Sequence, residues 1–323
     1  MENTAVKESV LEEDFDKKYE EYFTQGRIEF ITFHPSYSYE EFVEGITVET
    51  KGENIPCENI QYKLQSGIFK NMCKKALGAA IGLTREEVGE KSWKEVYADY
   101  HNKRDDVEFE EAPKYVLIID EINRGDMAKI FGELITLLEA DKRIKADNQL
   151  IVTLPTSGDK FGVPPNLYII ATMNTADRSI ALIDVALRRR FGFVEMNPDF
   201  KVLQDEHIDK NKDKFEENVC ELLTKSKEAI QKINREICGE ATIGRDKQIG
   251  HSFLFKVYTI NDLLLVWRYE VFPLLEEYCY GDYKKINKIL FNKDSDTEWI
   301  SEAEGIRSIS DLSTMLEAIL KHD

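Results

Sequence analysis

The sequence predicts an α/β fold, a parallel sheet flanked by helices, followed by a smaller domain that is mostly helical. Two apolar runs carry this prediction, Tyr115–Ile119 (YVLII) and Leu167–Thr172 (LYIIAT), and each leads into polar residues. Such runs are typical of strands buried in a parallel sheet, whose functional residues lie at the carboxyl ends of the strands. After Pro198 strand signals become sparse and helical stripes dominate, so we expect one domain over residues 1–198 and a second over residues 199–323.

The elements before the first of these runs follow from the spacing of apolar residues. Residues 3–23 carry apolar side chains about every four positions, which predicts a helix, and Ile28–Phe33 is a β-branched and aromatic run that predicts a strand. Thr47–Leu64 resembles a hairpin insertion, and Ile68–Leu77 has a single apolar helical stripe. Residues 84–114 are strongly charged and predict no firm element.

The remaining elements surround and follow the two apolar runs. Tyr115–Ile119 itself should be a central strand that is covered on both faces. The other predictions are a helix over Met127–Glu139 capped by Asp126, a hairpin of Leu150–Leu154 with Lys160–Val163, a short helix over Ile180–Leu187 and a strand over Phe191–Met196.

Composition excludes several classes of protein. The longest apolar stretches are far shorter than the roughly 20 residues that cross a bilayer, and the acidic N-terminus does not resemble a secretory signal, so we expect a cytoplasmic protein without a membrane segment. The five cysteines lack the spacing of a zinc site or a disulfide framework. The net charge of −18 disfavours binding of nucleic acid by the whole surface, so any DNA contact should be local or made by another polypeptide.

The first candidate site is the acidic pair that ends YVLIIDEINR (Tyr115–Arg124), which has the form of a Walker B motif. Successive strand residues project in opposite directions, so the two acids can perform different tasks. Asp120 would hold the hydration shell of Mg²⁺, and Glu121 would polarise the attacking water. A buried strand that ends in exposed acids also occurs without any catalytic role.

Two further motifs extend the candidate site. In MNTADRS (Met173–Ser179), Asn174 follows the second apolar strand and could orient a water or contact a γ-phosphate, although a turn-forming asparagine is a plain alternative. ALRRRF (Ala186–Phe191) places three arginines at a helix end, and one or two of them could reach a nucleotide on a neighbouring subunit. The alternative for these arginines is a helix C-cap with surface ion pairs.

Taken together and in order, the motifs resemble the McrB branch of the AAA+ proteins over roughly Asn3 to Leu290. The segments that carry the resemblance are Phe33–Ile46, Ser66–Phe69, Ile118–Arg143, Val163–Phe191, Ile249–Phe255 and Phe272–Asp282. The resemblance implies an AAA+ P-loop NTPase fold with a C-terminal helical lid. It also implies a hexameric ring that hydrolyses GTP, or ATP in some relatives, with Mg²⁺, and that drives a nuclease resembling McrC in the restriction of modified DNA.

The resemblance also assigns roles to residues. Asp120, Glu121 and Asn174 match the family motifs directly. The nucleotide-contacting set further includes Asp177, Arg178, Arg188 and Arg189, but motif order does not show which arginine acts within a subunit and which acts across the interface. In IGHSFLF, His251 and Ser252 are candidates for a second sensor in the lid, and a structural histidine is an equal alternative.

The sequence departs from the family pattern at the phosphate-binding loop. No GxxxxGKS or GxxxxGKT occurs, and Gly89–Ser92 (GEKS) lacks the Gly-Lys pair. The resemblance places Asn3–Thr4 just after that loop, so the expected explanations are a shortened chain, which we favour, or a degenerate subunit. The functional alternatives are a non-catalytic ring or scaffold subunit, or a remodelling ATPase related to MoxR or dynein, because the DEIN stretch is shared more widely.

Overall fold

A computed structural model describes residues 12–49, 61–176, 188–291 and 309–321. The contacts within the chain divide it into two compact units, residues 1–193 and residues 194–323, and each unit is described by itself.

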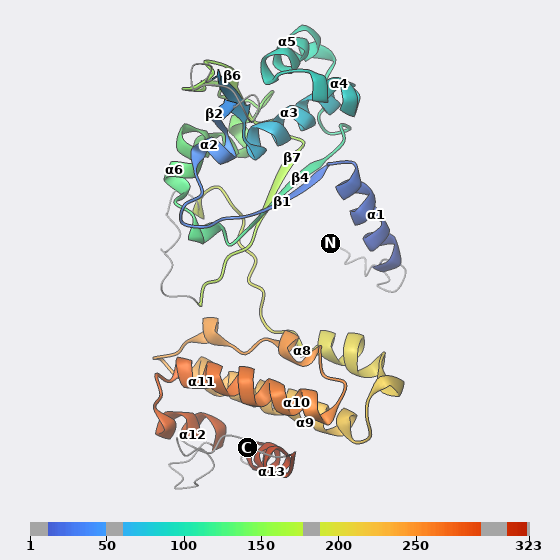
Figure 1. Cartoon of the computed structure of the whole chain (residues 1–323), viewed down its shortest axis with the longest axis vertical. Coiled ribbons are helices and arrows are strands. Elements are labelled where there is room, and N and C mark those ends of the chain that lie inside the picture. The colour runs from blue at the N-terminus through green and yellow to red at the C-terminus, as the bar shows by residue number, and fades with distance from the viewer. Residues whose placement is uncertain (1–11, 50–60, 177–187, 292–308, 322–323) are drawn as a thin grey trace, which may run out of the picture. The chain divides into compact units, whose positions relative to one another are not determined.

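The centre of unit 1 is a three-stranded parallel sheet (Figure 1). Its strands are β1 (Ile28–Thr32), β4 (Tyr115–Asp120) and β7 (Leu167–Ala171), in the order β1-β4-β7. Thr32 pairs in register with Asp120, and Ile119 pairs with Ala171, so the carboxyl ends of the three strands form one edge. The predicted parallel sheet is confirmed.

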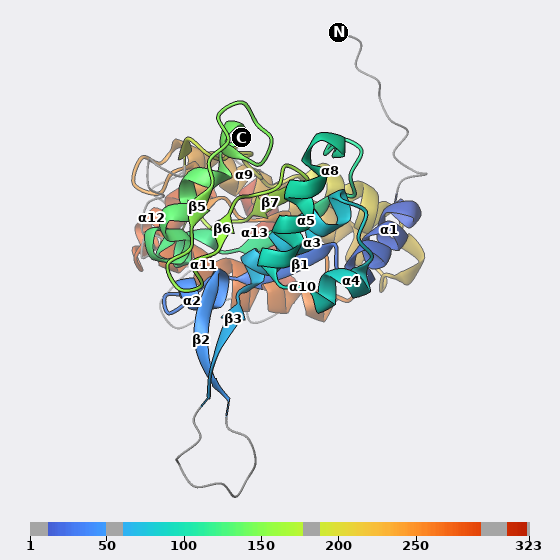
Figure 2. The ribbon, with the colours of Figure 1, turned by 90° about the horizontal axis from the view of Figure 1, so that it is seen from above.

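Helices and two antiparallel hairpins surround this sheet. The helices are α1 (Glu12–Thr24), α2 (Tyr39–Phe42), α3 (Ile68–Ala80), α4 (Arg85–Glu90), α5 (Trp93–Lys103) and α6 (Met127–Phe131), and the hairpins are β2 (Glu44–Glu49) with β3 (Gln61–Ser66) and β5 (Val152–Thr153) with β6 (Lys160–Phe161). Figure 2 shows that the β2–β3 hairpin projects away from the rest of unit 1. Both predicted hairpins are therefore present, and the charged region 84–114 contains the short helices α4 and α5.

The core of unit 1 contains a cluster of aromatic side chains among its aliphatic residues. Phe42 stacks on Phe69 with ring centroids 5.0 Å apart, and it meets the edge of Phe131 at 4.7 Å. Gly67 precedes α3 where the backbone lies close to α2, because a Cβ atom there would stand 2.3 Å from the carbonyl carbon of Phe42. A glycine is therefore required for this helix to pack against its neighbour.

The structure corrects three predictions for unit 1. The helix predicted over Met127–Glu139 ends at Phe131, because Gly132 takes φ +51°, and the chain continues as a 3₁₀-helix over Gly132–Leu138. The sheet is not covered on both faces by the described residues: Phe30, Tyr168 and Ile170 on one face are about half exposed, at 53%, 49% and 55%. The side-chain cap of Asp126 on α6 is confirmed.

The third correction is the strand predicted over Phe191–Met196. This segment has no strand pairing with any described residue, and Val194 and Met196 are 83% and 89% exposed. Phe191 is partly buried against the core of unit 1, and Phe193 is about half exposed, at 47%. The helix predicted over Ile180–Leu187 lies outside the described residues.

Unit 2 is helical in its described part. Its helices are α8 (Phe200–Val202), α9 (Val219–Gly239), α10 (Ile260–Val266), α11 (Phe272–Tyr278), α12 (Tyr283–Phe291) and α13 (Ile309–Leu320), with π-helical turns over Leu203–Asp209 and Trp267–Val271. The 21-residue helix α9 packs against α10, α12 and α13. Trp267 is fully buried in this core and donates through Nε1 to Ser226 Oγ at 3.0 Å. No described helix of the chain is long and apolar enough to span a membrane.

Candidate functional site

The sheet edge formed by the carboxyl ends of β4 and β7 brings together the acidic pair and the residues after β7. Asp120 is the last residue of β4, and Thr172 follows β7 directly. The Thr172 hydroxyl lies 2.5 Å from Asp120 Oδ1, and the Thr172 carbonyl accepts the amide of Ile122 at 2.9 Å. Two segments about 50 residues apart in the chain are thereby held side by side at one edge.

Glu121 has an unusual backbone at this edge. Its φ of +54° and ψ of +45° place it in the left-handed region, which costs a residue with a Cβ of the order of 1–3 kcal/mol. Its carbonyl accepts the amide of Arg124 at 2.8 Å, which closes a 3₁₀ turn over Ile122–Arg124. Strained residues of this kind cluster at functional sites, where the surroundings fix their conformation.

The carboxylate of Glu121 faces one cation within its own turn. Arg124 Nε lies 3.2 Å from Glu121 Oε2, without the geometry of a hydrogen bond. Glu121 Oε2 and the nearby Asn123 Oδ1 are both buried atoms that lack a hydrogen-bond partner within the described ranges. Buried acceptors normally have such a partner, and Glu121 Oε2 has the positive charge of Arg124 beside it instead.

Asn174 lies at the same edge and is exposed. Its Oδ1 accepts the amide of Ala176 at 3.0 Å, as in the turn expected of an asparagine, and its carbonyl accepts Asn123 Nδ2 at 3.1 Å. Its own side-chain amide has no partner among the residues the structure describes. The turn and the predicted sensor role are compatible, because the turn uses the acceptor and leaves the donor free.

The three arginines of ALRRRF differ in their surroundings. Arg190 pairs with Glu139 at 2.8 Å, and its side chain is only 14% exposed. Arg188 lies over the ring of Phe193, 5.7 Å from the centroid. Arg189 is exposed and has no partner in the part of the chain that is described. Asp177 and Arg178 lie outside the described residues.

His251 lies in unit 2 at the start of a short 3₁₀-helix over His251–Leu254. Its Nδ1 accepts the amide of Asp199 at 3.1 Å, and its ring meets the edges of Phe200 and Phe255. These contacts are those of a histidine with a structural role, which is the alternative to a second sensor. Ser252 follows His251 in the chain. The Ser252 hydroxyl lies close to Gly250, since a Cβ atom added to that glycine would stand 3.3 Å from it.

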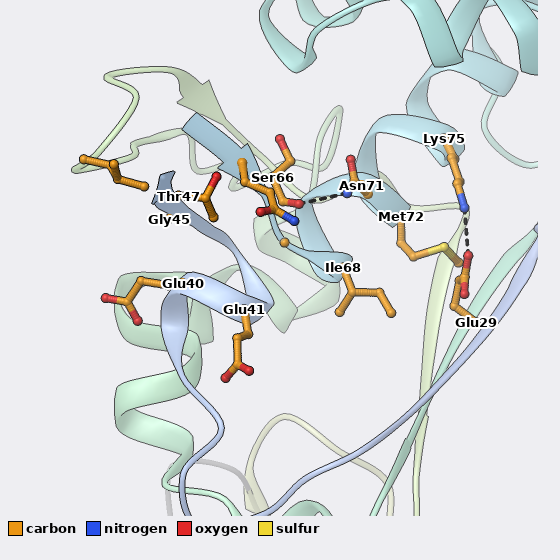
Figure 3. Close-up of a pocket in the computed structure, with 13 residues that line it drawn as sticks. Glu29, Glu40, Glu41, Gly45, Thr47, Ser66, Ile68, Asn71, Met72 and Lys75 are labelled. Atoms are coloured by element: carbon orange, nitrogen blue, oxygen red, sulfur yellow. Dashed lines mark hydrogen bonds and ion pairs between the residues drawn. The ribbon is translucent and has the colours of Figure 1, made fainter. Parts of the chain in front are cut away.

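A separate pocket of about 420 Å³ lies at the base of the β2–β3 hairpin (Figure 3). Its walls come from α2, α3, the hairpin and β1, and none of the predicted site residues lines it. Glu29, Glu40 and Glu41 line it, and its one lysine, Lys75, pairs with Glu29 at 2.8 Å. This excess of carboxylates makes the pocket unfavourable for a phosphate group.

The residues of the edge fit a hydrated Mg²⁺ ion. One oxygen of Asp120 is bound to Thr172, and the other has no partner within the described residues, so it can accept from a water of the metal shell. Within the described ranges, no group of three or more acidic, histidine or cysteine side chains is arranged so that it could hold a metal ion. The sequence did not single out Thr172, Asn123 or Arg124 as residues of the site. For Thr172 the one available signal was its hydroxyl at the end of an apolar strand.

Sequence profiles match both parts of the chain. The AAA domain (dynein-related subfamily) matches residues 14–191, and the McrB alpha-helical lid domain matches residues 225–287. The chain is 34% identical over 281 residues, 82% of its length, to the type IV methyl-directed restriction enzyme EcoKMcrB subunit of Escherichia coli (strain K12). It is 35% identical over 88 residues, 24% of its length, to the type II restriction enzyme BsuMI component YdiS of Bacillus subtilis (strain 168). The matches span 50% of the first relative and 26% of the second.

Proposed function

Because the chain belongs to the AAA family and carries a helical lid of the McrB type, we propose that it is the motor part of a GTPase or ATPase in a DNA restriction system. The observation that supports this most is the shared edge of β4 and β7, where the Thr172 hydroxyl bonds to Asp120 and to the amide of Glu121, and Asn123 in the turn after β4 donates to the Asn174 carbonyl. An acidic pair and an amide at one edge are what the hydrolysis of a phosphoanhydride needs: a metal holder, a water activator and a water-orienting group.

In this proposal each residue has one task. Asp120 accepts from the waters of Mg²⁺, and the metal, when bound, neutralises charge on the phosphates. Glu121 accepts a hydrogen bond from the attacking water and orients it toward the γ-phosphate. Asn174 donates its free side-chain amide to that water or to a γ-phosphate oxygen. Asp177 and Arg178 complete the proposed set around the nucleotide, whereas His251, the other residue expected there, has the contacts of a structural histidine.

In this proposal an arginine supplies positive charge to the nucleotide that is bound by a neighbouring subunit. Arg189 is exposed and has no partner among the described residues, and Arg188 has only an aromatic neighbour, so either can reach across an interface. Arg190 is already paired with Glu139 and is the least suited. We therefore assign Arg189 first and Arg188 second as the residue that acts on the nucleotide of the next copy in a ring, a hexamer by analogy with the family.

Three parts of the proposed function, phosphate binding, cleavage of DNA and contact with DNA, depend on other polypeptide regions. A phosphate-binding loop has to precede these residues for tight nucleotide binding, because its backbone amides and lysine hold the β- and γ-phosphates. A nuclease subunit resembling McrC would use the motor, and DNA would be contacted through that partner or through another domain. The proposed location is the cytoplasm.

The test is hydrolysis of GTP and ATP by a full-length protein that joins these residues to a phosphate-binding loop. We expect Glu121→Ala to reduce turnover by about a hundredfold or more, the lower range for a positioned catalytic base. Glu86→Ala, which removes an exposed carboxylate on α4, is the matched control and should leave turnover unchanged. Equal turnover in wild type and Glu121→Ala would reject the role of Glu121.

A further inference from the structure

We infer that Thr172 is a positioning residue that fixes both acids of the site, a role that rests on the proposed function. Thr172 lies directly after β7, while Asp120 and Glu121 lie at the end of β4. Its side chain contacts both acidic residues, and its backbone contacts the residues on either side of them. Thr172 touches neither substrate nor metal in this account and acts only through Asp120 and Glu121.

Four hydrogen bonds join Thr172 to four consecutive residues of β4 and the turn after it. Its amide donates to the carbonyl of Ile119 at 2.9 Å, and its carbonyl accepts the amide of Ile122 at 2.9 Å. Its hydroxyl lies 2.5 Å from Asp120 Oδ1 and 3.2 Å from the amide nitrogen of Glu121. The two backbone bonds continue the pairing of the strands, so the hydroxyl bonds are the ones that depend on the identity of the side chain.

The chemistry of a hydroxyl fixes the direction of both side-chain bonds. The amide of Glu121 can only donate, so the Thr172 oxygen accepts from it and gives its single proton to the Asp120 carboxylate. A hydrogen bond to a charged acceptor is stronger than one between neutral groups, and this bond holds the Asp120 carboxylate in one orientation. The second carboxylate oxygen is then presented to the metal shell.

The same hydroxyl stabilises the unusual backbone of Glu121. The residue enters the left-handed region at φ +54°, and the Thr172 hydroxyl binds the amide at which this change of direction begins. The carbonyl of Glu121 is bound on the other side by the Arg124 amide. Removing the hydroxyl frees the amide while leaving the rest of the turn intact, so the effect should fall on the placement of the two acids.

The experiment compares Thr172→Val, which keeps the shape but removes the hydroxyl, with Thr172→Ser, which keeps the hydroxyl. Calorimetry on the full-length protein measures the affinity for GTPγS and ATPγS with Mg²⁺ and with EDTA. Loss of an outer-shell partner typically costs 10–100-fold in metal affinity or activity. We therefore expect Thr172→Val to reduce the Mg²⁺-dependent gain in affinity by about tenfold or more. Affinity in EDTA should stay unchanged, and Thr172→Ser should resemble wild type.

Two outcomes would overturn the inference. One is a valine variant whose Mg²⁺-dependent gain equals that of wild type, and the other is an equal loss of affinity with Mg²⁺ and with EDTA, as a merely structural role predicts. Should the valine variant not fold, Thr172→Ala replaces it, and its nucleotide affinities with Mg²⁺ and with EDTA are compared in the same way. The proposed function fails separately, if wild type does not hydrolyse nucleotide or Glu121→Ala leaves turnover unchanged.

Discussion

The side-chain nitrogen of Lys70 lies 2.6 Å from Oε2 of Glu44, and both side chains are at most 2% exposed. A second carboxylate, Asp159, lies 2.8 Å from the same nitrogen, and Glu44 Oε1 accepts the amide of Ser157 at 2.8 Å. Lys70 belongs to α3, Glu44 to the start of β2, and Ser157 and Asp159 to the turn between β5 and β6. This buried ion cluster therefore ties both hairpins of unit 1 to one helix.

The first prediction is that Lys70→Met lowers the free energy of unfolding of unit 1 by about 3–5 kcal/mol, the usual cost of removing one partner from a buried ion pair. The physical reason is that Glu44 would remain buried and charged beside a neutral side chain. Urea unfolding measures the loss, and hydrogen exchange of β2 assigns it to unit 1. The control is Lys91→Met, which breaks the more exposed pair with Asp99 at 2.9 Å and should cost much less. Equal losses in the two variants would contradict this role of the cluster.

The second prediction concerns pH. Burial raises the pKa of Glu44, but hydrogen bonds from Lys70 and from the Ser157 amide lower it by more, so its pKa lies below the ordinary 4.5. A carboxylate with a lowered pKa adds stability that is fully present above its unfolded pKa and is lost as pH falls through the folded one. The stability difference between wild type and Lys70→Met should thus narrow as pH falls below 4.5. Urea unfolding at neutral pH and at about pH 3 tests this, and a constant difference would refute it.

The third prediction separates the arginines by complementation. Arg189→Ala should reduce turnover by about a thousandfold, the lower range for an arginine finger, with an unchanged melting temperature. Arg190→Ala should lower the melting temperature instead, because the side chain of Arg190 is mostly buried and paired with Glu139. Mixing Arg189→Ala subunits with Glu121→Ala subunits should restore activity, because some interfaces then hold an intact Glu121 and an intact Arg189. No recovery in the mixture would show that Arg189 does not act across an interface.

The fourth prediction concerns the IGHSFLF segment of unit 2. Asn234 on α9 donates to the carbonyl of Ile249 at 2.9 Å and accepts its amide at 2.7 Å, and both residues are buried. Asn234→Leu leaves two buried backbone groups without partners, each worth about 1–3 kcal/mol. We expect a clear fall in the melting temperature of unit 2, whereas the exposed Asn261→Leu should change it little. Similar melting temperatures for both variants would contradict this anchoring role.

The sequence predicted the strand edge well, because each of its parts is encoded locally. The apolar run of β4 and the acids that end it are contiguous, and the same is true of β7 and Asn174. Parallel strands share an edge at their carboxyl ends, so no long-range information was needed to expect these groups together.

The features that the sequence did not predict depend on distant partners. Thr172 contacts Asp120 across 52 positions, and Lys70 contacts Asp159 across 89, so neither role is visible in a local pattern. Lys70 also stands outside the apolar stripe of its helix, at a position where a lysine is usually solvated. Gly132 ended a predicted helix because one positive φ outweighs the propensity of its neighbours.

The central claim is that nucleotide binds at the edge formed by β4 and β7. The most direct measurement is an experimental structure of the full-length protein with GTPγS or ATPγS and Mg²⁺. We predict one water between Asp120 and the metal, and the side-chain amide of Asn174 within hydrogen-bond distance of a γ-phosphate oxygen or of the water facing Glu121. A nucleotide bound away from this edge, with Asp120 and Asn174 both remote from its phosphates, would contradict the account.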